Sequence, residues 1–352
     1  MHGDLVRIIG LMSGTSLDGL DIVCVDFVKN DTKKFEIIHS ETIEYSSEWV
    51  KRLRNGIHKN KEELIVLDDE YALLLSEMIS NFIAKNAISD IDFIASHGHT
   101  ILHKPNKGFT LQIGNGEIIS KRINQKVICD FRAQDVQYGG QGAPLVPIGD
   151  ALLFSQYDAC LNLGGFANVS YKRGGKRIAF DICPVNIVLN HYVRQTGVDY
   201  DDRGNVASKG KIHQELLKAL NQLPFYKKEY PKSLGLEWVQ EYVFPLIDSL
   251  ELSVENVLRT VVEHIAIQIS SSLRGQKEVL ITGGGVFNSF LIERVSFLSS
   301  IKIIIPSEEI VNYKEALIFA FLGLLRSDNQ VNCLRSVTGA HKDHSSGRIF
   351  IP

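Results

Sequence analysis

Three turns rich in small residues, each following an apolar run typical of a β-strand, are the features of the sequence best suited to chemistry. They contain Gly14 and Gly19, the pair Gly164 and Gly165, and the glycine run at 283–285. Such turns expose several backbone N–H groups, which together bind anions such as phosphate. A single acid, Asp181, follows a further apolar run and precedes a predicted helix. Backbone amides, a divalent metal and one well-placed base suit phosphoryl transfer.

Each turn also has an ordinary structural interpretation. Gly14 and Gly19 suit a tight hairpin because glycine reaches backbone angles that other residues avoid. Asp18 and Asp21 can order a loop as readily as they can hold a metal. Three such turns in order, each after a strand, favour nucleotide binding over three unrelated hairpins.

Several familiar signatures are absent from the sequence. It has no Gly-x4-Gly-Lys-Ser/Thr loop, and Gly-Asn-Gly at 114–116 lacks the third glycine of a dinucleotide fingerprint. It has no Gly-x-Ser-x-Gly elbow, and Cys183 has no evident histidine partner, which argues against a nucleophilic hydrolase. The spacing of His97, His99 and His103 is compatible with zinc, but a role in substrate hydrogen bonding or in the loop itself is the favoured interpretation.

The composition argues against several classes of partner and location. The 352 residues include 38 Lys and Arg against 41 Asp and Glu, a net charge of −3, so no basic excess favours nucleic acid or an anionic membrane. The five cysteines are scattered without a Cys-x-x-Cys pair, which is typical of reduced thiols in a cytoplasmic protein. No signal peptide is predicted, and the longest apolar run, at 316–325, is too short to span a bilayer. We therefore expect a cytoplasmic protein with no membrane or nucleic-acid partner.

Hydrophobic patterns supply the elements that position the candidate groups in the first half of the chain. Alternating residues predict antiparallel strands at 5–9, 22–28 and 35–45, around the first turn. One apolar helical stripe predicts a long amphipathic helix over 61–87. The apolar run at 92–97 is typical of a buried parallel strand, whose carboxyl end is where α/β sheets bind ligands.

The second half repeats this plan. An apolar strand ends at Gly164, a second strand follows, and a third strand at 177–180 leads to a helix over 185–195. A long helix over 254–273 and a strand over 279–282 precede the third glycine turn. The repetition suggests an α/β protein of two related domains.

The Gly- and Pro-rich loop at 130–144 is the expected place for one domain to give way to the next. We therefore predict an N-terminal domain over 1–130 and a C-terminal domain over 131–330, with the tail at 330–352 packing back on the first. The polar residues of the loop favour an active-site wall over a passive linker.

Six successive motifs resemble those of the anhydro-N-acetylmuramic acid kinases, in order and over nearly the whole chain. They are MSGTSLDGLD at 12–21, HGHT at 97–100, DFR at 130–132 with GGQGAPLVP at 139–147, NLGGFAN at 162–168, FDICPVN at 180–186 and GGGVFN at 283–288. The resemblance implies the fold of the sugar kinase, Hsp70 and actin superfamily, in which two related actin-like (ribonuclease H-like) α/β domains enclose an ATP cleft. It also implies an enzyme of cell-wall muropeptide recycling that uses ATP and Mg²⁺ to open the 1,6-anhydro bridge of a muramic sugar and phosphorylate O6.

The resemblance further implies roles for individual residues. Asp181 matches the base that takes a proton from the water attacking the anomeric carbon, and a neighbouring helix N-terminus would favour its ionised form. Thr100 and Glu315 match residues lining the sugar pocket. The implied ATP-binding positions are Gly14, Thr15, Ser16, Leu17, Asp18, Gly19, Leu20 and Asp21 in the first turn, with Gly164, Gly165, Gly283, Gly284 and Gly285 in the others. A homodimer is an expectation from the family alone, and no metal ligand is assigned.

The chain departs from the family pattern at positions expected near the sugar. Cys183 and Val185 stand where the family has glycines after the catalytic aspartate, and their bulk is expected to narrow the pocket floor. His99 replaces a glutamine, and Leu236 replaces an arginine whose charge leucine cannot supply. Two alternatives therefore stay open: a kinase of a different sugar or anhydro-sugar, and a catalytically inactive, ATP-dependent sensor or scaffold.

Overall fold

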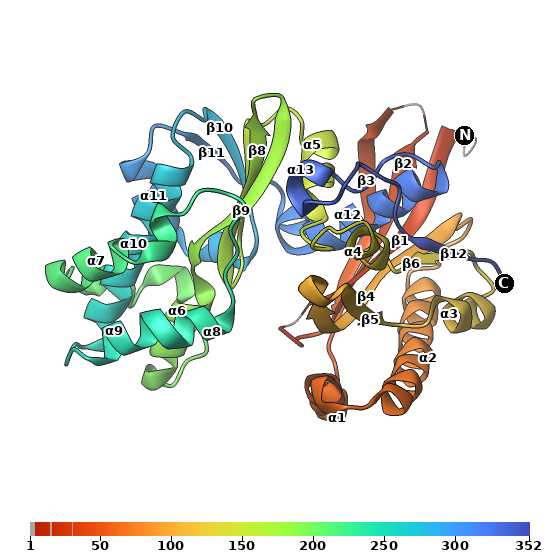
Figure 1. Cartoon of the computed structure of the whole chain (residues 1–352), viewed down its shortest axis with the longest axis horizontal. Coiled ribbons are helices and arrows are strands. Elements are labelled where there is room, and N and C mark those ends of the chain that lie inside the picture. Colours follow the sequence, from red (N-terminus) through yellow and green to blue (C-terminus); the bar gives the residue numbers. More distant parts are fainter. Residues whose placement is uncertain (1–3, 15, 30) are drawn as a thin grey trace. The chain divides into compact units, whose positions relative to one another are not determined.

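The structure, a computed structural model, describes residues 4–14, 16–29 and 31–352, and it divides into two compact units (Figure 1). Unit 1 contains Met1–Phe154 and Tyr313–Pro352, and unit 2 contains Ser155–Asn312. Each unit is built on a β-sheet covered by helices.

The segment from residue 131 to residue 154 belongs to unit 1, whereas the sequence predicted a boundary between residues 130 and 131. This segment packs on residues that return from the end of the chain. The Thr338 hydroxyl donates a hydrogen bond of 2.7 Å to Asp135, and a methyl group on Gly149 would come within 2.7 Å of the Ile318 side chain. These contacts, which pattern in the sequence does not reveal, place the division after residue 154.

The sheet of unit 1 has the strand order β12-β6-β4-β1-β2-β3, with β5 paired to β4. Its strands are β1 (Leu5–Ser13), β2 (Leu20–Val28), β3 (Asp31–Ile43), β4 (Phe93–Lys104), β5 (Phe109–Ile113), β6 (Val127–Cys129) and β12 (Arg348–Phe350). Strands β1, β2 and β3 pair antiparallel, whereas β4 is parallel to both β1 and β6. The parallel strands therefore end at the same edge of the sheet as the turn between β1 and β2.

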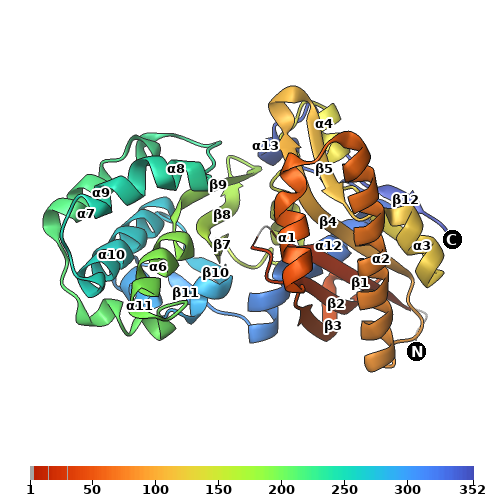
Figure 2. The same ribbon diagram turned by 90° about the horizontal axis from the view of Figure 1, so that it is seen from below.

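Helices cover both faces of this sheet. Helix α2 (Lys61–Lys85), which begins with a capping box between Asn60 and Glu63, buries its apolar stripe against β1, β2 and β4 (Figure 2). Helix α12 (Glu308–Ser327) covers the other face. A methyl group on Gly10 of β1 would collide with the Ala316 carbonyl oxygen, so glycine permits this close approach of helix and strand.

The remaining helices of unit 1 are short, and the end of the chain returns to its sheet. They are α1 (Ser47–Asn55), α3 (Gly116–Ile123), α4 (Ala133–Gln137), α5 (Val146–Leu153) and α13 (Arg335–Thr338). Strand β12 pairs antiparallel with β6. Within the residues that the structure describes, no helix has the length and apolar character needed to cross a bilayer.

The sheet of unit 2 has the order β11-β10-β7-β8-β9. Its strands are β7 (Ala159–Leu163), β8 (Phe166–Arg173), β9 (Lys176–Pro184), β10 (Glu278–Thr282) and β11 (Lys302–Ile304). Strands β7, β8 and β9 pair antiparallel, and β10 is parallel to both β7 and β11. Order and directions repeat those of β3-β2-β1-β4-β6 in unit 1. The predicted α/β fold of two related ribonuclease H-like units is therefore confirmed.

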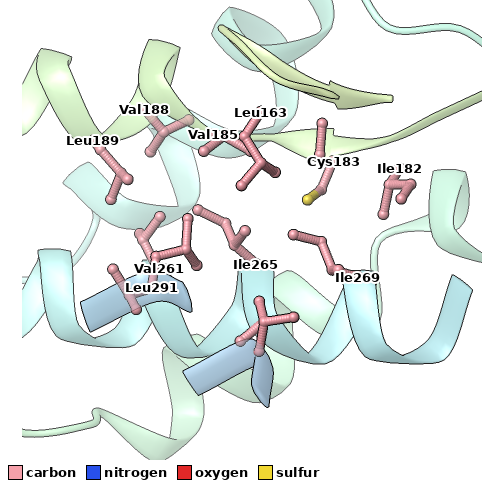
Figure 3. Close-up of a cluster of buried hydrophobic side chains, with 14 of the residues drawn as sticks. Leu163, Ile182, Cys183, Val185, Val188, Leu189, Val261, Ile265, Ile269 and Leu291 are labelled. Atoms are coloured by element: carbon pink, nitrogen blue, oxygen red, sulfur yellow. The ribbon is translucent and has the colours of Figure 1, made fainter. Parts of the chain in front are cut away.

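The core of unit 2 lies between its sheet and the helices α6 (Asn186–Val193), α10 (Val254–Ser272) and α11 (Ser289–Leu298). In Figure 3 the side chains of Leu163, Cys183 and Val185 face those of Ile265 and other residues of α10. Cys183 and Val185 are fully buried, and burial of an aliphatic side chain of this size is worth about 1.5–3 kcal/mol. The sequence had predicted that their bulk narrows the pocket floor. Instead, these side chains fill the core of unit 2.

The other helices of unit 2 are α7 (Gln214–Asn221), α8 (Leu236–Trp238) and α9 (Phe244–Asp248). Helix α8 follows an extended segment that crosses near β9, where the backbone N–H of Asp181 donates to the Lys232 carbonyl oxygen at 3.0 Å. This contact brings the segment before α8 to the candidate catalytic acid.

Candidate active site

The turn between β1 and β2 has the predicted hairpin geometry. The pairing of Ser13 with Leu20 closes it, and the Leu17 N–H donates to the Gly14 carbonyl oxygen at 3.4 Å. Leu17 has a positive φ of 62°, uncommon for a residue with a side chain and often a mark of functional sites. Thr15 lies outside the described residues.

One side-chain hydrogen bond and close packing on strand β3 hold this turn in place. The Ser16 hydroxyl donates to Asp18 at 2.7 Å. Gly19 lies against β3, where a methyl group would come within 2.7 Å of the Ile43 carbonyl oxygen. Glycine is required at this position by space, whereas neither Gly14 nor Gly19 has the positive φ that the sequence predicted.

Two nearby carboxylates influence Asp21 beside the turn. The Thr42 hydroxyl donates to Asp21 at 2.7 Å, but burial, with the nearby charges of Asp18 and Glu315, raises the pKa of Asp21 to about 6. Burial also raises the pKa of Glu315, which lies on α12, although Lys314 and Arg132 oppose that shift. Like charges held together and partly buried favour a bound cation.

The carboxyl end of β4 supplies neutral histidines to the same edge of the sheet. Burial lowers the pKa of His99 to about 4, and its Nδ1 lies 2.9 Å from the Ser13 hydroxyl. Tyr45 donates to Ser13 at 2.8 Å and lies 2.7 Å from the hydroxyl of Tyr71. If each hydroxyl donates once along this chain, His99 accepts at Nδ1 and carries its proton on Nε2.

The three histidines of β4 have separate partners. His97 accepts a hydrogen bond of 2.9 Å from Arg132, and His103 lies 3.1 Å from the Thr110 hydroxyl. In the described part of the chain they form no group whose ring nitrogens converge on one ion. The favoured role in hydrogen bonding is consistent with this arrangement. Thr100, the next predicted sugar residue, accepts from Gln112 at 3.2 Å.

In unit 2, two of the glycine turns leave neighbouring parallel strands. Thr282 pairs with Asn162, so the turns after β10 and β7 lie at the same edge of the sheet. Gly283 has φ of 85° and would clash with Leu163 if it carried a methyl group, as would Gly285. Gly284, by contrast, has open space beside it. Gly283 and Gly285 are therefore required for close packing, whereas the backbone of Gly284 is accessible to a ligand.

The start of helix α6 is already occupied by backbone contacts. The N–H groups of Val185 and Ile187 donate to the Gly165 carbonyl oxygen at 2.8 and 3.3 Å, and that of Asn186 donates to Gly164 at 3.3 Å. These groups therefore stabilise the Gly164-Gly165 turn and do not stabilise the carboxylate of Asp181, contrary to the sequence-based expectation. Their engagement also limits what this turn can offer to a phosphate.

Asp181 is held by a different backbone group. Its Oδ2 accepts a hydrogen bond of 2.8 Å from the Leu234 N–H, in the segment before α8. Burial raises the pKa of Asp181, and this hydrogen bond opposes the rise. Among the described contacts, Oδ1 has no protein donor. One oxygen is thus fixed and the other is available to accept a proton.

A row of polar residues crosses the sheet of unit 2 at Asp181. Asp181 pairs with Asn168, Asn168 with Asn162, and Asn162 with Thr282. Because the neighbouring residues of these strands lie in the core, the row occupies the opposite face of the sheet. The two asparagines and Thr282 were not predicted as site residues. In the sequence they appear only as polar residues inside apolar strands. The strand register is needed to show that they lie side by side.

Two sheets of one strand plan, with small-residue turns at their strand ends, form two units of actin-like fold. A sequence profile of the anhydro-N-acetylmuramic acid kinase family matches residues 6–352. The chain belongs to this family, whose members are ATP-dependent sugar kinases.

Individual relatives agree with the family match over almost the full length. The chain is 34% identical to the anhydro-N-acetylmuramic acid kinase of Haemophilus influenzae, covering 97% of each chain. It is also 34% identical to that of Shewanella sp. strain ANA-3, over 97% of this chain and 98% of the relative. A solved structure, the activator of the 2-hydroxyisocaproyl-CoA dehydratase from Clostridium difficile with bound ADPNP, covers 92% of this chain and 97% of its own at 13% identity, with a TM-score of 0.46.

Proposed function

We propose that the chain converts 1,6-anhydro-N-acetylmuramic acid to the 6-phosphate of N-acetylmuramic acid, with ATP as phosphoryl donor. Water attacks the anomeric carbon and loses a proton to Asp181. The bond between that carbon and O6 breaks, O6 forms a bond to the γ-phosphorus, and ADP leaves. Ring opening itself generates the O6 nucleophile, so one base suffices.

The observation that carries this proposal is the environment of Asp181. Its Oδ2 is fixed by the Leu234 N–H, its Oδ1 has no donor among the described residues, and burial raises its pKa. A fixed and partly desolvated carboxylate is a stronger base than one in water. Asn162 and Asn168, on the same face of the sheet, are placed to donate hydrogen bonds to the sugar or the attacking water.

The phosphates are assigned to the turn of unit 1, and the accessible glycine of unit 2 is a separate candidate for contact with the nucleotide. Residue 14 and residues 16–19 supply backbone N–H groups and the Ser16 hydroxyl, and Gly284 permits close approach of a ligand to the backbone. Mg²⁺ fits the carboxylates of Asp18 and Asp21, because hard oxygen donors suit this ion and their mutual repulsion needs a counter-charge. The ion, when bound, neutralises charge on the phosphates.

The sugar is assigned to the end of β4 and to α12. Thr100 and Glu315 retain the roles implied by the family. His99 stands in place of glutamine, and because its pKa is about 4 it is a neutral hydrogen-bonding group at physiological pH. An imidazole N–H can donate where a glutamine amide would, so this departure is compatible with the same ligand.

A coupled assay for ADP release tests the proposed substrate. We expect turnover with the anhydro-sugar and much slower turnover with N-acetylmuramic acid, which has no bridge to open. In ¹⁸O-labelled water the label should appear in the anomeric hydroxyl and not in the phosphate. Absence of label at the anomeric position would exclude attack by water on that carbon.

A kinase of a different sugar is the second candidate, and one observation favours it. Leu236, which replaces the family's arginine, is 47% exposed and lies two residues after the N–H that binds Asp181. An exposed leucine so close to the base favours a ligand without an acidic group at that point. A panel of 1,6-anhydro-sugars with and without the lactyl carboxylate distinguishes the candidates. Binding of ATP without turnover of any sugar would instead indicate a sensor or scaffold.

A further inference from the structure

A buried cluster of a carboxylate, a thiol and an imidazole lies in unit 1, apart from the groups assigned above. Asp135 comes from α4, and Cys333 and His344 come from the C-terminal segment, where they pair as an isolated antiparallel bridge. Their exposed fractions are 0%, 2% and 6%. One potential ligand atom from each lies within 4.8 Å of the others. Residues about 200 positions apart thus meet away from solvent.

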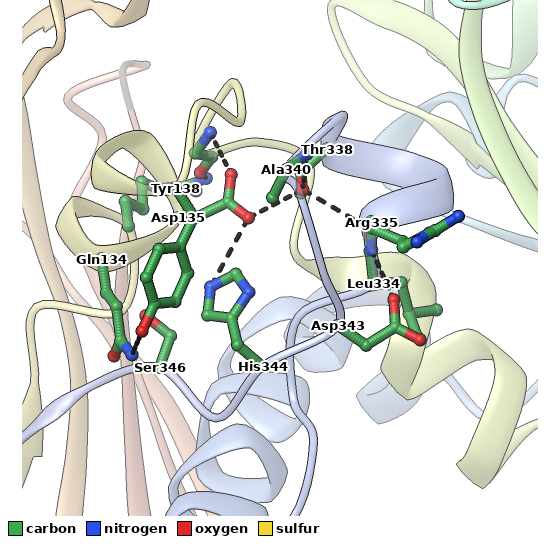
Figure 4. A network of polar contacts seen from close by, with 12 residues as sticks. Gln134, Asp135, Tyr138, Leu334, Arg335, Thr338, Ala340, Asp343, His344 and Ser346 are labelled. Atoms are coloured by element: carbon green, nitrogen blue, oxygen red, sulfur yellow. Dashed lines mark hydrogen bonds and ion pairs between the residues drawn. The ribbon is translucent and has the colours of Figure 1, made fainter.

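The imidazole of His344 has a buried nitrogen that lacks a partner. Its Nδ1 lies 3.1 Å from the Lys342 carbonyl oxygen, which can only accept, so Nδ1 carries the proton. Its Nε2 then has a free lone pair, and this atom has no hydrogen-bond partner within the described chain. In Figure 4 the ring points toward Asp135, whose Oδ1 lies 3.6 Å from Nε2. Two acceptors facing each other in a dry site call for a cation between them.

The carboxylate that faces this nitrogen is rigidly oriented. Its Oδ1 accepts from the Thr338 hydroxyl and its Oδ2 from the Gly142 N–H, both at 2.7 Å. The Tyr138 ring contacts the imidazole of His344 edge-on, with centroids 4.9 Å apart. Fixed outer contacts of this kind are typical of metal ligands, because they set the direction of each donor atom.

We propose that Asp135, Cys333 and His344 bind a divalent transition metal of the zinc type. Nitrogen and oxygen ligands lie about 2.0–2.2 Å from zinc, so an ion between two atoms 3.6 Å apart makes an angle of roughly 120° with them. The thiolate selects zinc or a similar ion over Mg²⁺ and Ca²⁺, which prefer oxygen. Bound metal fastens α4 to the C-terminal segment and stabilises unit 1 by binding only its folded form.

Cobalt titration of untagged protein tests the site directly. After removal of metal by a chelator, the full chain should bind one equivalent of Co²⁺ and show a thiolate-to-cobalt charge-transfer band, which Zn²⁺ then abolishes. Cys333→Ser should remove the band and weaken Zn²⁺ binding by at least about tenfold. Cys129→Ser, which alters a buried cysteine of the same unit outside the cluster, should leave both unchanged.

Several outcomes would overturn the proposal. A wild-type chain that binds neither Co²⁺ nor Zn²⁺ would mean that a protonated His344 pairs with Asp135 without metal. A band retained in Cys333→Ser would place the bound ion elsewhere. His344→Gln provides a second ligand variant if Cys333→Ser does not fold, as judged by circular dichroism, and it should likewise lose binding.

Discussion

The two units share one strand plan, yet they place an acid on different strands of it. In unit 1 the pair between the second and third strands is Asp21 and Thr42, with the acid on the second strand. In unit 2 the corresponding strands pair Asn168 with Asp181, with the acid on the third. The first acid lies beside two other carboxylates, whereas the second has a backbone donor and two amide neighbours. This difference between the units underlies the two proposed roles, a cation site in unit 1 and a base in unit 2.

The turn after the first strand of each unit also differs, in its length and in its contacts. In unit 1 six residues separate β1 from β2, and they carry hydroxyls and an acid. In unit 2 only Gly164 and Gly165 separate β7 from β8, and both carbonyls accept from the start of α6. The longer turn of unit 1 has few backbone bonds among its described residues, so it is the better candidate for a ligand, whereas the short turn of unit 2 is tied to a helix. The comparison teaches that corresponding glycine turns need not have the same function.

The largest effect is expected from removing the base of unit 2. Asp181→Asn keeps an oxygen that can accept from the Leu234 N–H but cannot take a proton, so kcat should fall about 10²–10⁴-fold with little change in the affinity for ATP. Steady-state kinetics and calorimetry measure the two effects. Asp199→Asn, at an exposed acid of the same unit, is the matched control and should retain wild-type activity. Turnover near that of wild type in folded Asp181→Asn would refute the assignment.

The next largest effect concerns the glycines that pack beneath the third turn. Gly283→Ala combines a positive φ with a contact of 2.7 Å to Asn162, so unit 2 should lose about 2–4 kcal/mol of folding free energy. Gly284→Ala meets open space and should cost under about 0.5 kcal/mol while weakening ATP binding. Urea denaturation followed by circular dichroism measures both. Equal losses of stability would contradict the distinction drawn between the two glycines.

A smaller and opposite effect on stability is expected from the acid of unit 1. Because the pKa of Asp21 is about 6 when folded and lower when unfolded, the folded state binds more protons between these values. Stability should therefore rise as the pH falls through about 6 and then level off. Asp21→Asn should stabilise the chain by about 1–2 kcal/mol at pH 7, allowing for partial solvent screening, and by much less at pH 4.

The same substitution should weaken the binding of MgATP. Asp31→Asn is the control, because the ion pair of Asp31 with Lys34 is exposed, whereas Asp26 forms a largely buried ion pair with Arg7. If the Asp21→Asn variant is more stable but binds MgATP with unchanged affinity, the assignment of a cation site to unit 1 is wrong. It would leave the base in unit 2 unaffected.

The smallest effect is expected at the histidine that departs from the family. His99→Gln exchanges one neutral hydrogen-bonding group for another, so kcat/KM should change by less than about threefold. Because the pKa of His99 is about 4, the wild type and this variant should have parallel pH profiles between pH 6 and pH 8. A profile that changed shape in this range would mean that His99 titrates during the reaction.

Much of the fold could be predicted because its signals are local. Alternation and helical stripes place β1, β2 and α2, and the predicted helix over 61–87 corresponds to Lys61–Lys85. Glycine runs mark the turns. The division of the chain depends instead on packing between residues 131–154 and the C-terminal segment, which periodicity does not report.

The candidate site could be predicted only in part, because some of its features are local in the sequence and others are not. The acid at position 181 stands out beside an apolar run, but its partner is a backbone N–H at position 234, and backbone groups leave no trace in residue type. The polar row through Asn162 and Asn168 depends on strand register, which a sequence does not state. The cluster of Asp135, Cys333 and His344 joins residues about 200 positions apart, and nothing in their spacing predicts it.

The interruption of unit 1 by unit 2 has a consequence for the order in which the chain folds as it is made. Unit 2 is one continuous segment, Ser155–Asn312, so all of its strands are present once that segment has left the ribosome. Unit 1 must wait for α12 and β12, which are complete only at residues 327 and 350. At about 5–20 residues per second, synthesis of unit 2 alone adds roughly 8–30 s before most of α12 and all of β12 are made. During that interval one face of its sheet lacks the cover of α12, so this half of the nascent protein has the greater need of chaperones.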